Sequence, residues 1–304
     1  MSEAIERVGF IGLGNMGEPM TRNLAAAGFT LTLGDLDSGR RTRLAGEVEA
    51  KVGEHASDFA GVQALITMLP TGAEVRSVLL DWDGGLAAVL DPRTIVVDMS
   101  SSDAVGTREL GAELARSGLV LIDAPVSGGV SGAVAGSLAV MVGGEDAEID
   151  RIDPLLSALG AKILRVGPLG SGHAVKALNN YVAAACFTAS VEALIIGAGF
   201  DLDPRAIVDA INGSTGRNFN TELTIPSQVL DRAFGTGFSL RLMAKDVALA
   251  QALAEATGTD APTCALMTEL WAQARDGEGP EQDFTSAARY WERRSGRQIP
   301  GGDD

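Results

Sequence analysis

The chain changes character near residue 170, and this change limits the folds that it can adopt. Before that point, short apolar segments typical of buried strands alternate with longer amphipathic segments typical of helices. After Gly172 only helical patterns follow. Alternating strands and helices predict βαβ units and a doubly wound, mostly parallel sheet. The sequence therefore predicts an α/β domain over residues 1–166 and an all-α domain over 167–304, which begins with a long interdomain helix.

The same patterns predict where the individual elements lie. Expected strands cover residues 7–12, 29–33, 64–68, 94–98, 119–122, 138–143 and 161–165. Expected helices of the first domain cover residues 15–27, 38–51, 72–80, 104–117 and 146–159. Those of the second domain cover residues 173–199, 204–212, 221–233, 240–257, 262–275 and 284–293. Because no linker rich in Pro, Gly or Ser separates the halves, we expect the domains to pack closely about the long helix.

The first expected strand runs into a glycine-rich turn with GxGxxG spacing, at residues 12–17 (GLGNMG). Gly12 permits a tight turn, Gly14 lets the backbone approach a pyrophosphate, and Gly17 lets the next helix pack closely on the strand. Because the motif lies between a strand and a helix, as this type of site requires, it predicts a Rossmann-type dinucleotide site. The expected cofactor contacts of the turn are Gly12, Leu13, Gly14, Asn15, Met16 and Gly17.

An aspartate, Asp35, follows the second expected strand. A carboxylate there can accept hydrogen bonds from the adenosine ribose and would repel a 2′-phosphate, which favours NAD over NADP. An ordinary turn aspartate is the alternative interpretation. Arg40 and Arg41 come soon after and leave NADP open as a second cofactor.

Further segments follow expected strands, where ligands bind in open parallel sheets. Leu69 and Pro70 follow strand 64–68 and are expected to contact the cofactor, and serines 100–102 follow strand 94–98. An ordinary turn and a helix N-cap are their structural alternatives. Residues 123–133 (DAPVSGGVSGA) form an expected loop rich in glycine. Its successive N–H groups can bind an anion beside the Ser127 hydroxyl, unless the segment is only a β-turn between strands.

The start of the long helix carries a lysine, Lys176, in an otherwise apolar segment. Asn180 lies one helical turn later, so the amine and the amide share a face and can reach one small polar ligand together. A lysine desolvated in a buried helix has a lowered pKa, as a general acid/base near neutral pH requires. A lysine that reaches out to solvent is the alternative. Lys245, beside Asp246, belongs either to the site or to a solvated helix face, and His173 suits either a helix start or an active site.

The composition excludes several kinds of partner. The 40 acidic and 24 basic residues give a net charge of −16, which repels nucleic acid and anionic membranes. Any anionic substrate must therefore be captured by locally placed cations or amides. With two histidines and two cysteines that lack the spacing of metal ligands, we expect no metal site.

Other features bear on location and assembly. Cys186 and Cys264, as free thiols, and a charged N-terminus without a secretory signal predict a cytoplasmic protein. Polar residues interrupt the apolar run over 177–200, which fits a core helix better than a membrane span. The alanine-rich long helix and the apolar helices after residue 240 offer more apolar surface than a small domain can hide. We therefore expect a homodimer or homotetramer.

Taken together, these motifs resemble those of the β-hydroxyacid dehydrogenase family, which includes 3-hydroxyisobutyrate dehydrogenase and tartronate semialdehyde reductase. The resemblance spans nearly the whole chain and rests on segments 9–17, 98–101, 123–133, 170–180 and 245–246. The chain departs from the family at Ala104, where a proline is frequent, so the local helix start can differ. Asn179 replaces the histidine of the related 6-phosphogluconate dehydrogenases. That difference and the short helical domain argue against a sugar-phosphate substrate.

The resemblance also implies roles for individual residues. It implies that Lys176 is the catalytic lysine and that Asn180 orients the substrate oxygen. The substrate carboxylate would be held by Ser127, Gly128 and Gly129. The nicotinamide end of the cofactor would lie near Ser101 and Lys245, with Lys245 closing over the site from the helical domain.

The expected activity is therefore hydride transfer between NAD, or alternatively NADP, and a small anionic 3-hydroxy acid or its semialdehyde, with Lys176 as general acid/base. The nearest alternative is an imine or aldehyde reductase on the same fold, although imine reductases tend to lack this lysine. The other alternative is a non-catalytic dinucleotide-binding protein. Such a protein is expected to have lost Lys176 or Asn180, and both are present.

Overall fold

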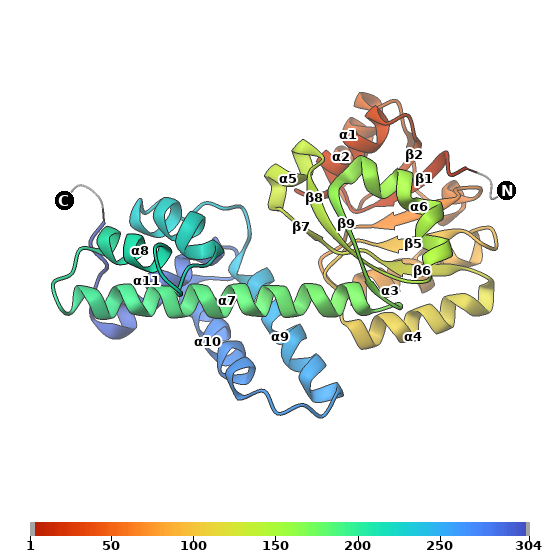
Figure 1. The fold of residues 1–304 in the computed structure, drawn as a ribbon. Helices are drawn as coiled ribbons and strands as arrows, with labels where there is room; N and C mark the ends of the chain where they lie inside the picture. Colours follow the sequence, from red (N-terminus) through yellow and green to blue (C-terminus); the bar gives the residue numbers. More distant parts are fainter. Residues whose placement is uncertain (1–3, 302–304) are drawn as a thin grey trace. The chain divides into compact units, whose positions relative to one another are not determined.

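The computed structural model describes residues 4–301 (Figure 1). Contacts divide the chain into two compact units, one ending at Lys176 and the other beginning at Ala177. The sequence places the boundary after residue 166, where the last expected strand ends. The contacts instead keep the start of the long helix with the first unit, because its first turn bonds to residues at the ends of the strands.

The first unit is built around a nine-stranded sheet with the strand order β3-β2-β1-β4-β5-β6-β8-β7, in which β9 also pairs with β8. Strands β1 to β6 pair in parallel, whereas β8 is antiparallel to β6 and β7. The order 3-2-1-4-5-6 is that of the doubly wound sheet that binds dinucleotides, so the predicted fold class is confirmed. The strands are β1 (Arg7–Ile11), β2 (Thr30–Gly34), β3 (Lys51–Val52), β4 (Ala64–Thr67), β5 (Ile95–Asp98), β6 (Val120–Asp123), β7 (Val126–Ser127), β8 (Leu138–Gly143) and β9 (Gly160–Gly167).

Helices flank this sheet on both faces (Figure 1). They are α1 (Gly17–Ala26), α2 (Ser38–Glu47), α3 (Gly72–Leu80), α4 (Ala104–Leu114), α5 (Gly129–Ala135) and α6 (Asp146–Leu159). Short 3₁₀ turns lie at Ala56–Phe59, Trp82–Gly84, Leu86–Ala88 and Ala115–Ser117. With both faces covered, β4 and β5 are buried along their whole length, which is why they read as continuous apolar runs.

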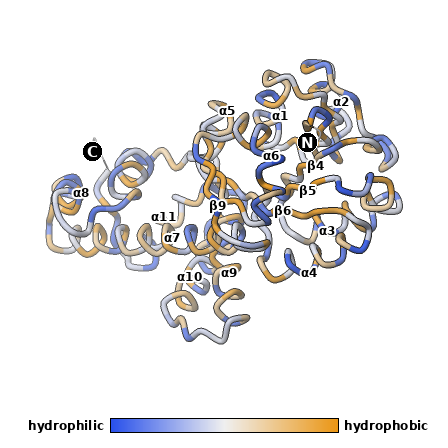
Figure 2. Tube along the Cα trace, turned by 45° about the vertical axis from the view of Figure 1, so that its right-hand side comes forward, coloured by the Kyte–Doolittle hydropathy of each residue, from blue (hydrophilic) through white to orange (hydrophobic). Residues whose placement is uncertain are grey.

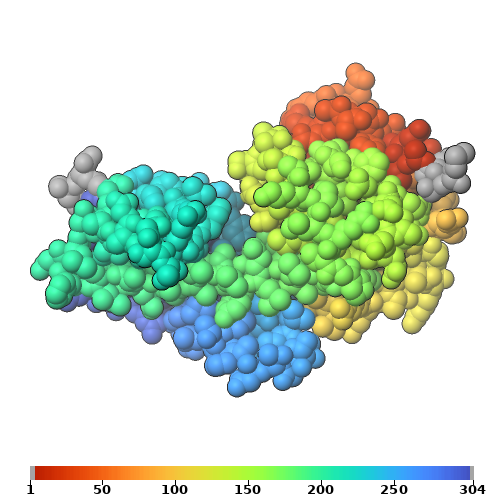
Figure 3. Space-filling view, viewed as in Figure 1, coloured from red at the N-terminus to blue at the C-terminus, as the bar shows by residue number. Residues whose placement is uncertain are grey.

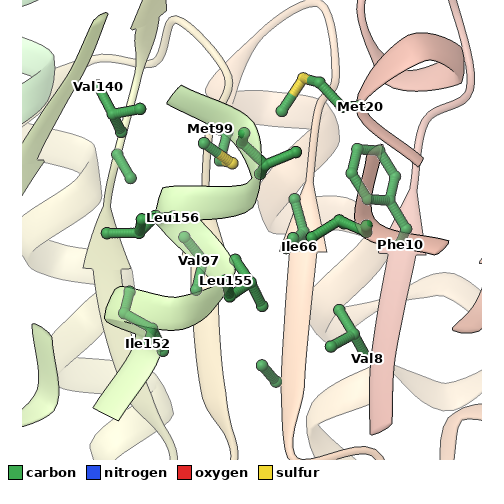
Figure 4. Packing of buried hydrophobic residues seen from close by; sticks show 14 of the residues in the cluster. Val8, Phe10, Met20, Ile66, Val97, Met99, Val140, Ile152, Leu155 and Leu156 are labelled. Carbon is green, nitrogen blue, oxygen red and sulfur yellow. The ribbon is translucent and has the colours of Figure 1, made fainter. Parts of the chain in front are cut away.

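Two hydrophobic cores fill the two faces of the sheet, because adjacent strand residues point to opposite sides. Ile66 and Val97 belong to the core that α6 covers with residues such as Leu155 (Figure 4). Leu65 and Val96 belong to the opposite core, beneath α3 and α4. Burial of each such side chain contributes about 1.5–3 kcal/mol. The two cores hold the carboxyl ends of β4 and β5 side by side.

The second unit is helical, as predicted. It contains most of α7 (Ser171–Ala198), together with α8 (Pro204–Asn212), η5 (Asn220–Leu230), α9 (Leu240–Ala256), α10 (Pro262–Glu278), η6 (Phe284–Ser286) and α11 (Ala287–Ser295). Aromatic side chains form the centre of its core, with ring centroids 5.4–6.2 Å apart. They are Phe187, Trp271, Phe284 and Trp291.

Helix α7 is rich in apolar residues along its length (Figure 2). Within the described residues it is the one helix whose length and composition would allow it to cross a membrane. A buried core helix passes the same test, and Ala184, Phe187 and Val191 of α7 lie in the core of the second unit. These contacts support the expectation of a core helix.

Two of the expected helices differ most clearly from the observed ones. The helix expected over 38–51 ends earlier, because Glu49 adopts a φ of 54° that a helix does not continue, and the edge strand β3 follows. The helix expected over 221–233 is instead the π-helix η5, with Pro226 inside it. Since proline has no N–H group, it cannot donate the hydrogen bond of a regular α-helix.

Candidate active site

The glycine-rich turn between β1 and α1 has the geometry of a pyrophosphate site. Gly12 has a φ of 97°, and a Cβ on it would lie 2.3 Å from the Met68 carbonyl oxygen. A Cβ on Gly17 would lie 1.9 Å from the carbonyl oxygen of Gly12. A Cβ on Gly14 would meet nothing within 4 Å. Two glycines are therefore required by close packing, and the third leaves open space where a pyrophosphate can approach the backbone. Leu13, Asn15 and Met16 complete this turn before α1.

Asp35 follows β2 and is tied to the same turn. Its Oδ2 accepts a hydrogen bond of 2.6 Å from the N–H of Leu13, and its Oδ1 accepts one of 2.8 Å from the N–H of Asp37. The residue is thus a turn aspartate and also a neighbour of the pyrophosphate position. Because each carboxylate oxygen has more than one lone pair, Asp35 keeps acceptor capacity for ribose hydroxyls.

The two arginines after Asp35 differ in what they contact. Arg41 donates to the carbonyl oxygen of Asp35 at 2.9 Å and pairs with Glu54 at 3.3 Å, and its side chain is only 12% exposed. Arg40 is 39% exposed and lies 3.8 Å from the Asp35 carboxylate. Arg41 is therefore held by contacts within the protein, whereas the more exposed Arg40 can turn toward a 2′-phosphate.

A hydrogen bond joins the first residues of the two loops that follow β4 and β5. The N–H of Leu69 donates to the Ser100 hydroxyl at 2.9 Å, and the N–H of Ser100 donates to the Asp98 carboxylate at 3.0 Å. Pro70 and Ser101 lie in these same two loops. The predicted cofactor residues of both segments therefore lie at the carboxyl edge of the sheet, where the expected crevice would be.

The segment expected as a loop over 123–133 is more ordered than predicted. It contains β7 and α5, because Val126 and Ser127 pair with Val140 and Ala139 of β8. Gly128 and Gly129 follow β7 with φ angles of 130° and 63°, which other residues rarely adopt. Both glycines are thus needed to turn the chain from the strand into α5. Ser127 stands at the edge of this turn and is partly exposed.

The first turn of α7 is anchored in a buried polar cluster of the first unit. Asp123, at the end of β6, accepts hydrogen bonds of 2.7 Å from the N–H groups of both Gly170 and His173. It therefore caps the amino end of α7, where N–H groups lack helical partners. Burial raises the pKa of the Asp123 carboxyl above its usual range, and His173 and the two N–H groups oppose that shift. Lys176 follows in the next turn and is only 9% exposed.

In the second unit, Asn180 of α7 and Lys245 of α9 are brought together by one aspartate. Asp246 is buried; its Oδ2 accepts a hydrogen bond of 2.6 Å from Asn180 Nδ2. Its Oδ1 lies 3.2 Å from the ammonium group of Lys245. Asn180 Oδ1 also accepts a hydrogen bond of 3.1 Å from Asn179. The lysine is consequently oriented within the fold and is not simply part of a solvated face.

Three aspartates that hold candidate site residues or the start of α7 in place are not among the site residues expected from the sequence. Asp98, Asp123 and Asp246 are buried and bond to candidate site residues or to the start of α7. For two of them the sequence does carry a signal, since Asp98 and Asp123 each end an otherwise apolar strand. Within residues 4–301 the structure contains no group of three or more His, Cys, Asp or Glu side chains that could hold a metal ion.

Known protein families match both units of the chain. The family model described as the NAD binding domain of 6-phosphogluconate dehydrogenase matches residues 7–167. The model described as NAD-binding of NADP-dependent 3-hydroxyisobutyrate dehydrogenase matches residues 170–291. These matches identify NAD as the cofactor, with NADP as an alternative.

Individual relatives are similar over nearly their whole length. The chain is 31% identical to 2-(hydroxymethyl)glutarate dehydrogenase of Eubacterium barkeri, over 97% of this chain and 98% of the relative. It is 32% identical to NAD-dependent L-serine dehydrogenase of Pseudomonas aeruginosa, over 96% and 100% of the two chains. A solved structure of 3-hydroxyisobutyrate dehydrogenase of Mycobacterium tuberculosis with L-serine aligns with a TM-score of 0.87 at 33% identity, over 94% and 99% of the two chains.

Proposed function

The chain belongs to the β-hydroxyacid dehydrogenase family, and we propose that it transfers a hydride between NAD and a small 3-hydroxy acid or its semialdehyde. Family membership makes it an oxidoreductase with a nicotinamide cofactor. The relatives named above support the substrate class, because their substrates share one chemistry. Serine, 3-hydroxyisobutyrate and 2-(hydroxymethyl)glutarate each carry a primary hydroxyl on the carbon next to a carboxylate-bearing carbon. The groups that distinguish them lie on that second carbon.

The burial of Lys176 is the observation that carries the mechanism. Lysine is almost never this buried unless it pairs or acts chemically, and Lys176 is 9% exposed. In the oxidation we propose that the neutral amine of Lys176 accepts the proton of the substrate hydroxyl. In the reduction its ammonium form returns that proton to the carbonyl oxygen. When bound, the nicotinamide accepts or supplies the hydride.

Other residues of the chain bind and orient. The Asn180 carboxamide is held by Asp246 through one hydrogen of Nδ2, and its second Nδ2 hydrogen is assigned to the reacting oxygen. Ser127, Gly128 and Gly129 are assigned to the substrate carboxylate. This local capture is required because the net charge of −16 repels anions. Leu69, Pro70, Ser101 and Lys245 are assigned to the cofactor.

The position of Asp35 supports a preference for NAD. Its carboxylate lies beside the glycine-rich turn, held by the N–H groups of Leu13 and Asp37. A 2′-phosphate would meet this negative charge, whereas ribose hydroxyls can donate to it. Because Arg41 is engaged within the fold, Arg40 alone of the two arginines is positioned to offset the repulsion.

We also propose a cytoplasmic homodimer or homotetramer. Large apolar side chains remain exposed on the second unit: Val182, Ile196, Phe200, Phe219, Leu223 and Leu266. Part of α7 lies at the surface of this unit (Figure 3). A stable interface buries roughly 800 Å² on each partner, and an interface that covers these side chains would remove them from water.

An activity screen tests the proposed reaction. Small 3-hydroxy acids that differ at the second carbon, their semialdehydes, and a cyclic imine are each assayed with NAD(H) and NADP(H) on the full-length protein. We expect turnover of a 3-hydroxy acid and its semialdehyde, with the higher kcat/KM for NAD(H). Turnover of the imine without turnover of any hydroxy acid would replace the proposal with the imine reductase alternative.

A further inference from the structure

The His173 ring lies in a buried cluster of the first unit that the proposed reaction does not use. Its side chain is fully buried. Its Nε2 lies 3.1 Å from the carbonyl oxygen of Ser100, and its Nδ1 lies 2.8 Å from the hydroxyl oxygen of Thr107. These neighbours come from the loop after β5 and from the start of α4, so the ring joins the start of α7 to a segment that is distant in the sequence.

The hydrogen bonds of these neighbours leave two arrangements of protons on the ring. A carbonyl oxygen can only accept, so Nε2 must carry a hydrogen to bond to Ser100. The Thr107 hydroxyl has a single hydrogen, and it is donated to the carbonyl oxygen of Asp103 at 2.7 Å. While that hydrogen is on the Asp103 carbonyl, Thr107 can only accept from the ring, so Nδ1 carries a hydrogen as well; if Thr107 instead donates to Nδ1, the ring is neutral with its hydrogen on Nε2. A ring with hydrogens on both nitrogens is the imidazolium cation.

The charges around the ring favour the imidazolium over the neutral tautomer. The Asp98 carboxylate lies 3.6 Å from Nε2, and the Asp123 carboxylate lies 3.8 Å from Nδ1. Both carboxylates are buried, and buried carboxylates are costly unless a cation or hydrogen-bond donors compensate them. Asp98 also accepts from Thr67 and Ser102, whose hydroxyls are neutral. An imidazolium between Asp98 and Asp123 supplies the positive charge that these neutral donors do not.

We propose that His173 is a positioning residue, doubly protonated, that fixes the first turn of α7 and with it Lys176 at the carboxyl ends of β5 and β6. The ring bonds to the β5 loop and to α4. The backbone N–H group of His173 bonds to Asp123 at the end of β6. Lys176 follows one helical turn later. The expected effect of His173 on turnover rests on the proposed role of Lys176. The protonation state of the His173 ring is independent of that role.

The protonation state can be measured directly, because the chain has only two histidines. The second, His55, is exposed, and His55→Gln leaves His173 as the single histidine of the full-length protein. In ¹⁵N-histidine-labelled protein at pH 8, we expect both ring nitrogens of His173 to carry hydrogen and to give the nitrogen shifts of an imidazolium. One unprotonated ring nitrogen at pH 8 would show a neutral tautomer and overturn the proposal.

The positioning role is tested by kinetics on folded variants. His173→Gln keeps a donor for the Ser100 carbonyl and removes the charge. We expect kcat to fall by about 10- to 100-fold, in line with a small displacement of a catalytic group. KM for NAD should change less, because the glycine-rich turn and Asp35 follow β1 and β2, and only the β5 loop with Ser101 borders the ring. Turnover within about threefold of wild type would overturn the positioning role.

A second pair of variants applies if His173→Gln does not fold. Thr107→Val removes the acceptor of Nδ1, and Thr107→Ser retains it, so kcat should fall in the first and recover in the second. Thr21→Val is the matched control, because the buried Thr21 hydroxyl has no hydrogen-bond partner among the described residues, and its kcat should not change. Equal turnover in the two Thr107 variants would contradict the proposal. If Lys176→Ala keeps wild-type turnover, the proposed function fails and the positioning role with it, while the nitrogen shifts still decide the charge of His173.

Discussion

Replacing Asp246 with asparagine tests how the second unit holds two candidate site residues. Asp246 is buried, accepts a 2.6 Å hydrogen bond from Asn180 and lies 3.2 Å from the Lys245 ammonium group. Asparagine offers one acceptor oxygen where aspartate offers two, so its amide nitrogen must face one of the two donors. The substitution therefore breaks one contact whichever way the amide turns.

The expected cost follows from the burial of each contact. A buried hydrogen bond to a charged group contributes about 1.5–3 kcal/mol. The Lys245 side chain is 20% exposed, so its ion pair with Asp246 contributes less to stability, on the order of 0.5 kcal/mol. Asparagine can keep its oxygen toward Asn180, which leaves a neutral hydrogen bond of about 0.5–1.5 kcal/mol, and it then loses the Lys245 ion pair. We therefore expect Asp246→Asn to lower the free energy of unfolding of this unit by about 1–2 kcal/mol. Because Asn180 is then held less firmly, kcat should also fall, by up to about tenfold.

Urea unfolding followed by tryptophan fluorescence measures this loss, because Trp271 and Trp291 are buried in the core of the same unit. Asp276→Asn is the control: its carboxylate is 69% exposed and pairs with the adjacent Arg275. The control should change the free energy of unfolding by less than about 0.5 kcal/mol. A loss in Asp246→Asn no larger than that of the control would refute the reasoning.

Three further predictions concern the cofactor, pH and assembly. On one substrate, kcat/KM should be higher with NAD than with NADP because of Asp35; equal or better use of NADP would mean that Arg40 binds the 2′-phosphate. Hydrogen bonds from Arg43 and Arg22 lower the pKa of Glu18 to about 2, so its stabilising effect is present above the usual carboxyl pKa and is lost as the pH falls through about 2. Urea titrations of wild type and Glu18→Gln should differ at pH 7 by about 0.5–1 kcal/mol, since all three side chains are partly exposed, and should converge toward pH 2; a difference independent of pH would contradict this. Sedimentation velocity at micromolar concentration should show a dimer or tetramer, and a monomer would refute the assembly.

Local sequence patterns predict those elements whose structure is determined by residues within or next to the segment. The buried strands β4 and β5 are predicted by their apolar runs, because both faces of the sheet are covered. The glycine-rich turn is predicted by spacing, because Gly12 and Gly17 are required by contacts within the motif and its neighbouring strand. The order of strands then follows from the rule for dinucleotide-binding sheets.

The sequence was insufficient where distant residues decide the structure. Helix α5 lies in a glycine-rich segment that reads as a loop, and it forms where β7 pairs with β8. The two interpretations of His173 could not be separated, because Thr107 and Ser100, which bond to its ring, are far away in the sequence. The contacts of Arg41 were similarly hidden, since Glu54 lies beyond the helix that carries the arginine.

The central claim is that Lys176 is the general acid/base, and Lys176→Ala tests it most directly. We expect kcat and kcat/KM to fall by a common factor on the order of 10²–10⁴, the usual contribution of a positioned acid/base group. Affinity for NAD should change little, and Asn180→Ala should cost less, because an amide orients the oxygen without transferring a proton. The control is Lys162→Ala on β9, an exposed lysine whose loss should leave turnover unchanged. If folded Lys176→Ala protein retains more than about a tenth of wild-type turnover, well outside the acid/base range, Lys176 is not the catalytic residue.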